Sequence, residues 1–339
     1  MKKHGCFSPV VILTLFASCA SAAPEWAVNV QAVYPNARYI AQRGEGRTRQ
    51  EAETAALRSL SYYFESRVTS ETADLYKSTE KDGVENTERR TEQNTIVQTQ
   101  TRLAAVRYAE DPWYNRDAKE WQTVAYIDRE EAWTVYEPQA KKAADALIAL
   151  YDAAEKEGEN FSRALRFDLT AAYGSGAEFT ALRGFSQILH PQKARTLFAE
   201  ADALRPTLEE KTYTARQNAS VFIDCPGDFE GLLYQAAVSA LGAAGFPVER
   251  RRGAASCVCA IRVDEGLQQL ESGLMYYPSL TGTITGKTGA VFSFTVKPGR
   301  QGAINPDVAK RRAYTALAAA LGEAFPGELN KKRESLAGN

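Results

Sequence analysis

The sequence predicts an α+β fold, with two small two-layer modules of the α/β-sandwich kind joined by a helical segment after an N-terminal signal peptide. In the first and last thirds of the chain, some segments alternate between apolar and polar residues, as strands do, and others have apolar residues at helical spacing. Between these thirds, helical spacing dominates. The predicted ranges are a leader at 1–18 or 1–22, a tether at 19–36, an α+β module at 37–136, helices at 137–218, a second module at 219–326 and a disordered tail at 327–339.

Charge balance argues against a nucleic-acid partner. The 339 residues contain 41 Lys and Arg against 42 Asp and Glu, so the whole chain has no electrostatic attraction to DNA or RNA. The local basic runs, Arg250–Arg252 and Lys331–Arg333, are only three residues long and are typical of a solvated surface.

The first residues have the layout of an export signal. Lys2 and Lys3 precede an apolar run, Val10–Ala17, which is far shorter than the roughly 20 residues that span a bilayer. Phe16–Cys19 resembles a lipobox, which would make Cys19 the acylated, palmitate-bearing N-terminus of an outer-membrane lipoprotein facing the periplasm. Ala20–Ala22 is the alternative cleavage site, and cleavage there would give a secreted periplasmic protein of the cell envelope without an anchor.

The first module begins with a short strand at Tyr39–Ala41, which ends at Gly44-Glu45-Gly46. Thr48 and Glu51 form a capping box, and a helix with an alanine-rich stripe follows. The predicted strands after it lie at 64–72, 103–108 and 121–127. Residues 77–101 are polar and fit either an exposed hairpin or a surface helix.

The middle segment is predicted to be helical. Its first apolar stripe, at 133–154, continues through Pro138, which indicates one kinked helix or two abutting helices. Further helices are expected at 161–218, with His190 at a junction before Pro191 and with a break at Pro206.

The last module has the element order β-α-β-β-β-α. Asp228 is expected to cap its first helix, and Asn305 its last, with Pro306 at the first helical position. Residues 286–289 form a tight turn between two strands. The predicted strands are 220–225, 257–263, 274–285 and 290–297.

Motifs that suggest chemistry have simpler structural explanations. Thr281–Thr288 lacks the first glycine of a phosphate-binding loop and precedes a strand, so a hairpin turn is expected. Gly44-Glu45-Gly46 lacks the third glycine of a dinucleotide site and fits a close strand-to-helix turn. His190 is the single histidine after the leader, and Asp128, Glu130 and Glu131 fit a helix start. We therefore expect no enzyme activity, catalytic residue, cofactor or metal.

Two residue sets remain candidates for a site. Cys225 could form a disulfide with Cys257 or Cys259, or all three could be small buried apolar residues. Trp113, Tyr114 and Trp121 flank a turn, where they could form an aromatic platform for a glycan or a partner protein, or cover the edge of the sheet.

A family resemblance covers about residues 34–150. Tyr39-Ile40-Ala41, Gly44-Glu45-Gly46, the alanines of the next helix and Trp121 with Ala125–Asp128 resemble the Lpp-twenty, or twenty-kilodalton outer-membrane, lipoprotein family. The resemblance implies a small α+β domain carried by an acylated cysteine, without an agreed biochemical activity. It also implies flagellar or outer-membrane assembly proteins as partners.

These observations lead to three functional hypotheses. The first is a membrane-anchored, non-enzymatic scaffold or assembly accessory that works through contacts with other envelope proteins. The second is a peptidoglycan- or glycan-binding module that uses the region of Trp113 and Trp121. The third is a hydrolase with two carboxylates, which counting residues alone does not exclude.

Overall fold

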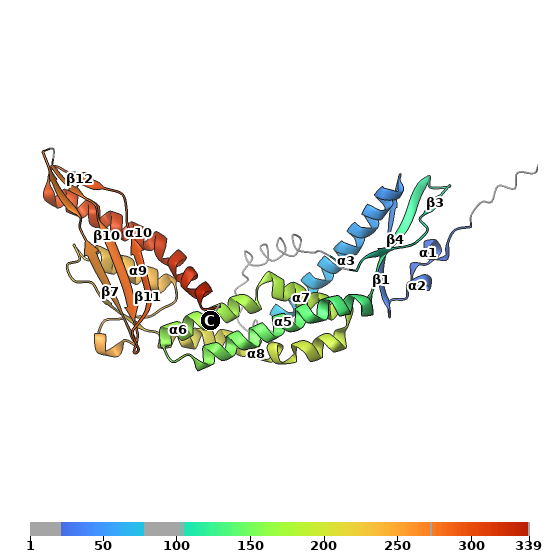
Figure 1. Ribbon diagram of the computed structural model, residues 1–339, viewed down its shortest axis with the longest axis horizontal. Coiled ribbons are helices and arrows are strands. Elements are labelled where there is room, and N and C mark those ends of the chain that lie inside the picture. Colours follow the sequence, from blue (N-terminus) through green and yellow to red (C-terminus); the bar gives the residue numbers. More distant parts are fainter. Residues whose placement is uncertain (1–21, 78–102, 104, 272, 338–339) are drawn as a thin grey trace, which may run out of the picture. The chain divides into compact units, whose positions relative to one another are not determined.

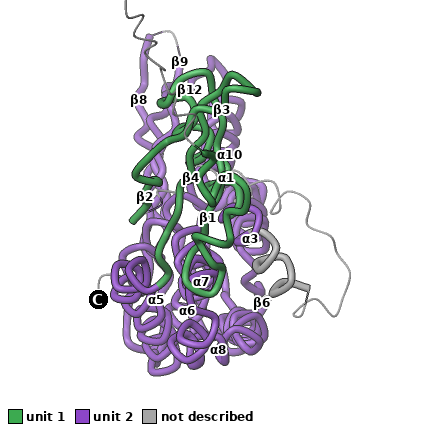
Figure 2. The backbone as a smooth tube through the Cα atoms, turned by 90° about the vertical axis from the view of Figure 1, so that its right-hand side faces the viewer, with its two compact units in different colours: residues 1–63, 105–129 green, residues 64–104, 130–339 purple. Residues whose placement is uncertain are grey.

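The computed structural model describes residues 22–77, 103, 105–271 and 273–337, and its fold is α+β as predicted. It divides into two compact units, residues 1–63 with 105–129 and residues 64–104 with 130–339 (Figures 1 and 2). Within the described ranges, no helix combines the length and the apolar composition needed to cross a bilayer.

Unit 1 is built on an antiparallel sheet. The strands are β1 (Tyr39–Gly46), β2 (Arg107–Tyr108), β3 (Trp113–Asn115) and β4 (Glu120–Asp128). β4 is central and pairs with the other three, and its register with β1 runs from Tyr39 opposite Asp128 to Gly46 opposite Trp121. Gly44-Glu45-Gly46 lies on β1, and Trp121 and Ala125–Asp128 lie on β4, so the long β1–β4 ladder brings these segments together.

Helix α3 (Arg49–Lys77) approaches this sheet very closely through its first turns. The amide of Glu51 donates to the Thr48 hydroxyl (3.1 Å), and the Glu51 carboxylate accepts from the amide of Arg47 (2.8 Å), so the predicted helix start is confirmed. A Cβ on Gly44 would lie 2.1 Å from the amide nitrogen of Ala56. The glycine is therefore required by the contact between strand and helix, as the sequence predicted.

The opposite face of the sheet in unit 1 is covered by two short helices, α1 (Glu25–Val28) and α2 (Val30–Val33). Trp26 is 7% exposed and packs in one cluster with Val124 and partly buried Tyr126. The prediction of a tether at 19–36 was wrong for this part. The sheet has apolar side chains on both faces, and the segment before β1 covers the second face. Unit 1 therefore does not have the two-layer arrangement that the sequence predicted.

In unit 2, the remaining turns of α3 and four further helices form the helical part. Residues 64–72 were predicted to be a strand but continue α3. Their buried side chains Phe64 and Val68 follow Leu60 at four-residue intervals, which is the spacing of a helix face. The other helices are α5 (Arg129–Lys156), α6 (Asn160–Gly174), α7 (Ala177–Leu189) and α8 (Pro191–Asn218).

Two internal prolines lie within these helices. α5 runs through Pro138 as one helix, in agreement with one of the two predicted alternatives. α8 runs through Pro206, where a break was predicted, and this prediction was wrong. Leu208 and Ala215 are both buried beyond Pro206, so the packing of the second half of α8 compensates for the hydrogen bond that the proline removes.

The last part of unit 2 has a five-stranded sheet in the order β11-β10-β7-β5-β6. β5 (Val221–Asp224) is parallel to β6 (Val248–Glu249) and β7 (Cys257–Asp264), whereas β10 (Ser279–Thr285) is antiparallel to β7 and β11 (Ala290–Val296). The inward side chains belong to one buried layer with α9 (Leu232–Ala243) and α10 (Pro306–Ser335). This is the two-layer arrangement that the sequence predicted.

A second sheet was not predicted as a separate element. β8 (Leu267–Leu270), β9 (Gly273–Tyr276) and β12 (Gln301–Ala303) form it, with β9 in the centre. The predicted strand at 274–285 is instead split between β9 and β10. One face of this small sheet packs on α10, where Tyr276 contacts the cluster of Ala309 and Ala313.

The helical segment and the last module share one core, although the sequence separated them at residue 218. Phe161 of α6 is fully buried and stacks on Phe246, with ring centroids 4.6 Å apart. It also stacks on Phe292 of β11 at 6.2 Å. Residues 137–218 are therefore not only a linker, because α6 and the end of α8 complete the core beneath the five-stranded sheet.

The prediction of a disordered tail at 327–339 was wrong, because α10 continues through Pro326 to Ser335. Leu329 is 3% exposed, and Arg333 lies 3.2 Å from the carboxylate of Asp168 on α6. The same carboxylate, whose side chain is 3% exposed, also binds Arg216 of α8 at 2.7 Å. One buried charge therefore joins α6, α8 and the end of α10.

Candidate functional site

The predicted aromatic platform is divided by the sheet of unit 1. Trp113 pairs with Gln122 and Tyr114 with Trp121, so Trp113 points to one face while Tyr114 and Trp121 point to the other. Trp113 packs in the cluster of Trp26 and Val124. The structure thus brings two of the three predicted residues together, and the third belongs to the packed layer under α1.

Tyr114 and Trp121 lie beside the start of α3. Their ring centroids are 5.4 Å apart, and the Arg49 guanidinium lies 4.4 Å from the centre of the Trp121 ring. Tyr114 is 40% exposed. A cation over one face of Trp121 leaves less of that ring for stacking on a sugar, so the geometry favours the role of covering the edge of the sheet.

Cys225, Cys257 and Cys259 are free thiols, so the disulfide between Cys225 and Cys257 or Cys259 is not formed in the structure. Cys257 and Cys259 are both buried in the core of the five-stranded sheet. Burial raises the pKa of the Cys259 thiol to about 12 and that of Cys225 to about 11. These thiols are protonated at neutral pH, which makes them poor nucleophiles.

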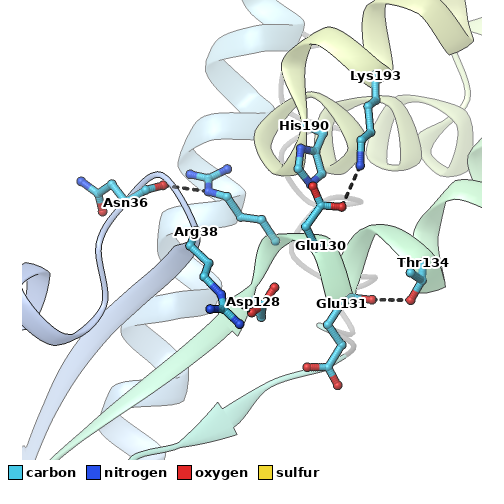
Figure 3. Close-up of polar contacts among 9 residues, drawn as sticks. Asn36, Arg38, Asp128, Glu130, Glu131, Thr134, His190 and Lys193 are labelled. Atoms are coloured by element: carbon cyan, nitrogen blue, oxygen red, sulfur yellow. Dashed lines mark hydrogen bonds and ion pairs between the residues drawn. The ribbon is translucent and has the colours of Figure 1, made fainter.

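The histidine and the carboxylates near the start of α5 fit structural roles (Figure 3). In unit 2, His190 lies between α7 and α8, as predicted, and its Nε2 is 3.4 Å from a Glu130 oxygen. The other Glu130 oxygen binds Lys193 at 2.7 Å, and the His190 ring meets Trp133 edge to face at 5.5 Å.

In unit 1, the neighbouring polar groups are also paired with each other. Arg38 donates from Nε to Asp128 at 2.9 Å, and Arg129 donates to the carbonyl oxygen of Asn36 at 2.9 Å. In the part of the chain that the structure describes, no group of three or more His, Cys, Asp or Glu side chains is placed to hold a metal ion.

The Gly286–Gly289 turn is a hairpin between β10 and β11, as the sequence predicted. Its amides nevertheless hold an anion, because Lys287 and Thr288 donate to the Glu159 carboxylate at 2.9 and 2.6 Å. Hydrogen bonds from the Thr288 side chain and from these amides hold the pKa of Glu159 below its ordinary value. A carboxylate of the chain itself therefore occupies the position that a phosphate would need.

An exposed apolar surface surrounds the small sheet of β8, β9 and β12. Among the described residues, five of the thirteen exposed large apolar side chains fall between positions 267 and 308. Apolar side chains mark a surface for a partner when they lie together, and two of these five, Leu270 and Ile304, line the same groove. The five residues are Leu267 (51% exposed), Leu270 (42%), Tyr277 (48%), Ile304 (86%) and Val308 (44%).

A groove of about 350 Å³ lies on this surface, and we call it the apolar groove. Its lining consists of apolar side chains, two glycines and one cation: Leu270, Gly273, Leu274, Met275, Arg300, Gly302, Ala303 and Ile304. Gly273 has φ +135°, and a Cβ there would lie 2.8 Å from the carbonyl oxygen of Ala303. The close approach of β9 and β12 therefore depends on glycine.

Sequence reasoning missed this surface. All four residues of β8 are exposed, so they show no alternation between a buried and a solvated face. The signal that was present is weak: one short apolar run, Leu274–Tyr276, follows Leu267-Gln268-Gln269-Leu270 with Gly273 between them, which is compatible with a hairpin.

Comparisons with known proteins give no family for this chain. No family model matches, and no curated protein matches. Among solved structures, a minor lipoprotein from Acinetobacter baumannii has 11% identity and a TM-score of 0.25, with 35% of this chain and 93% of that chain covered. A candidate lipoprotein from Caulobacter crescentus CB15 has 19% identity and a TM-score of 0.25, with coverage of 36% and 93%.

A third solved structure matches most of the chain. The secreted protein HP1454 from Helicobacter pylori has 10% identity and a TM-score of 0.37, with 87% of this chain and 97% of that chain covered. These neighbours are described as lipoproteins and as a secreted protein. Because all three TM-scores lie below 0.5, the similarities carry no argument about the function of this protein.

Proposed function

We propose that this protein is a non-enzymatic accessory of the bacterial cell envelope that binds another envelope protein through the apolar groove. The observation that carries the proposal is the concentration of exposed apolar side chains around β8, β9 and β12, with Ile304 86% exposed. An apolar surface of this kind is costly in water unless a partner covers it.

The chemistry of the groove indicates what the partner presents. Leu270 and Met275 offer an apolar wall, and Arg300 supplies a positive charge in the same lining. A partner segment with an aliphatic side chain beside a carboxylate satisfies both, because the guanidinium can bind the carboxylate while the apolar atoms leave water. Flagellar or outer-membrane assembly proteins are the proposed partner class.

The proposed location is the outer membrane, facing the periplasm, through an acyl anchor on Cys19, which lies outside the described residues. The support is the lipobox-like sequence Phe16–Cys19 after a short apolar run. Intact mass spectrometry of the mature protein tests it. A chain that begins at Ala23 without acyl groups would replace the anchored form with the secreted one.

Site-specific photocross-linking tests the docking surface. A photoreactive residue replaces Ile304, and the matched control replaces Tyr213, which is an apolar residue of α8 with 66% exposure outside the groove. Irradiation of intact cells should give a discrete adduct with another envelope protein from position 304 and none from position 213. Equal labelling at both positions, or adducts with lipid alone, would remove the proposal.

The glycan-binding alternative has less support, because Trp113 does not share a face with Tyr114 and Trp121. Sedimentation with purified peptidoglycan tests this alternative directly. Co-sedimentation that is lost in Trp121→Ala would restore it.

A further inference from the structure

The edge of the five-stranded sheet is a second surface of interest. β11 is the outermost strand, and β10 is its single strand neighbour among the described residues. An edge strand presents a row of amide and carbonyl groups to its open side, where another chain can pair with them.

A groove of about 310 Å³ runs along this strand. One wall consists of four consecutive residues of β11, from Ala290 to Ser293, and the other consists of Glu328, Lys331 and Lys332 near the end of α10. Side chains of consecutive strand residues point to alternate faces, so four in a row line a groove only when the groove follows the strand at its edge. Figure 1 shows β11 beside β10 in this sheet.

β11 carries few of the features that usually keep edge strands from pairing. Its seven residues, Ala290–Val296, include no proline and no charged side chain. The irregularity in its register with β10 is confined to its start, opposite Ile284 and Thr285. From Phe292 to Val296 the strand is regular, which suits the addition of a further strand.

The charges around this edge are mainly positive. Lys287 precedes the strand and Lys297 follows it, while Lys331 and Lys332 line the groove. Glu328, the one acidic residue of the lining, is already bound to Lys331 at 2.6 Å. Lys332 adds a positive charge to the lining, so a segment that lies along β11 is favoured if it is acidic.

We propose that the edge of β11 binds an extended acidic segment of a partner protein as an added strand. The backbone of that segment pairs with β11, and its carboxylates face Lys331 and Lys332. Backbone pairing supplies affinity, whereas the lysines select the charge of the partner. This surface does not include residues of the apolar groove, so the two proposals stand separately.

The first test uses the full wild-type chain and a labelled seven-residue peptide that alternates valine with glutamate. Fluorescence anisotropy should report binding that weakens with salt, and the matched valine–lysine peptide should not bind. Hydrogen-exchange mass spectrometry should show slower exchange in residues 290–296 when the acidic peptide is present. Binding without this protection would overturn the proposal, and so would the absence of binding.

A charge-reversal pair tests the role of the lysines. The double variant Lys331→Glu with Lys332→Glu should bind the acidic peptide on the order of tenfold more weakly. The control is Lys141→Glu with Lys142→Glu on α5, another adjacent lysine pair whose first member is bound to a carboxylate within its helix. Equal weakening of peptide binding in both double variants would overturn the proposal. Concentration-dependent dimers of the wild type that compete with the peptide would also overturn it, since a second copy would then occupy the edge.

Discussion

Replacing Phe161 with alanine tests whether the helical segment and the last sheet form one cooperative unit. Phe161 lies in the first turn of α6, is fully buried, and stacks on Phe246 and on Phe292 of β11. An aromatic side chain buries about 150–250 Å². At about 25 cal/mol per Å², the lost apolar burial is worth about 4–6 kcal/mol as an upper bound.

Alanine keeps the Cβ, and the cavity relaxes in part, so we expect Phe161→Ala to lower the free energy of unfolding by about 4 kcal/mol. Urea unfolding followed by circular dichroism gives this value. Tyr213→Ala is the control, because it removes an aromatic ring that is 66% exposed and should change the free energy by no more than about 0.5 kcal/mol.

Hydrogen exchange locates the effect. If the core is shared, peptides from α6 and from the strands β7, β10 and β11 should lose protection together in Phe161→Ala. The reasoning would be refuted if α6 alone exchanged faster while the sheet kept the protection of the wild type. That result would return residues 137–218 to the role of a separate helical linker.

Two further predictions concern a buried carboxylate and a close backbone contact. The pKa of Glu159 is lowered in the folded state, so its contribution to stability is present above the ordinary carboxyl range and is lost as the pH falls through the folded-state value. Glu159→Gln should therefore remove about 1–2 kcal/mol at pH 7 and progressively less as the pH falls below the ordinary carboxyl range, as measured by urea unfolding across a series of pH values. Gly44→Ala should destabilise unit 1 by about 3 kcal/mol, because its Cβ would meet the backbone of Ala56. The control is Gly158→Ala, which should be nearly neutral because a Cβ there meets nothing within 4 Å. Unfolding followed by tryptophan fluorescence measures both variants.

Local signals predicted much of the fold. Alternation predicted β7 and β11, and Asn305 caps α10 as expected, since its side chain accepts from the amides of Asp307 and Val308 at 2.9 and 3.2 Å. The N-cap of α9 is Gly231 and not the predicted Asp228, although the Asp228 carboxylate still accepts from the amides of Leu233 and Tyr234. These features depend on neighbours in the sequence, which is why the sequence reveals them.

The errors arose where distant packing overrides a local preference. Pro206 and Pro326 each favour a helix end, yet buried side chains beyond them, such as Leu208 and Leu329, stabilise the continued helices. The segment around Trp26 has no periodicity because its helices are only one turn long. The apolar groove could not be predicted, because it arises where short strands meet and its exposed residues follow no period.

The position of α10 in chain order has a consequence for how unit 2 is made. This helix of 30 residues follows every strand of the two sheets that it helps to cover. Ribosomal synthesis proceeds from the N-terminus, so the apolar faces of β7, β10 and β11 emerge before Leu317, Leu321 and Phe325 arrive to cover them. Until then, those faces are open to aggregation, and a chain that stops before Pro306 is expected to need a chaperone or to be degraded by proteases.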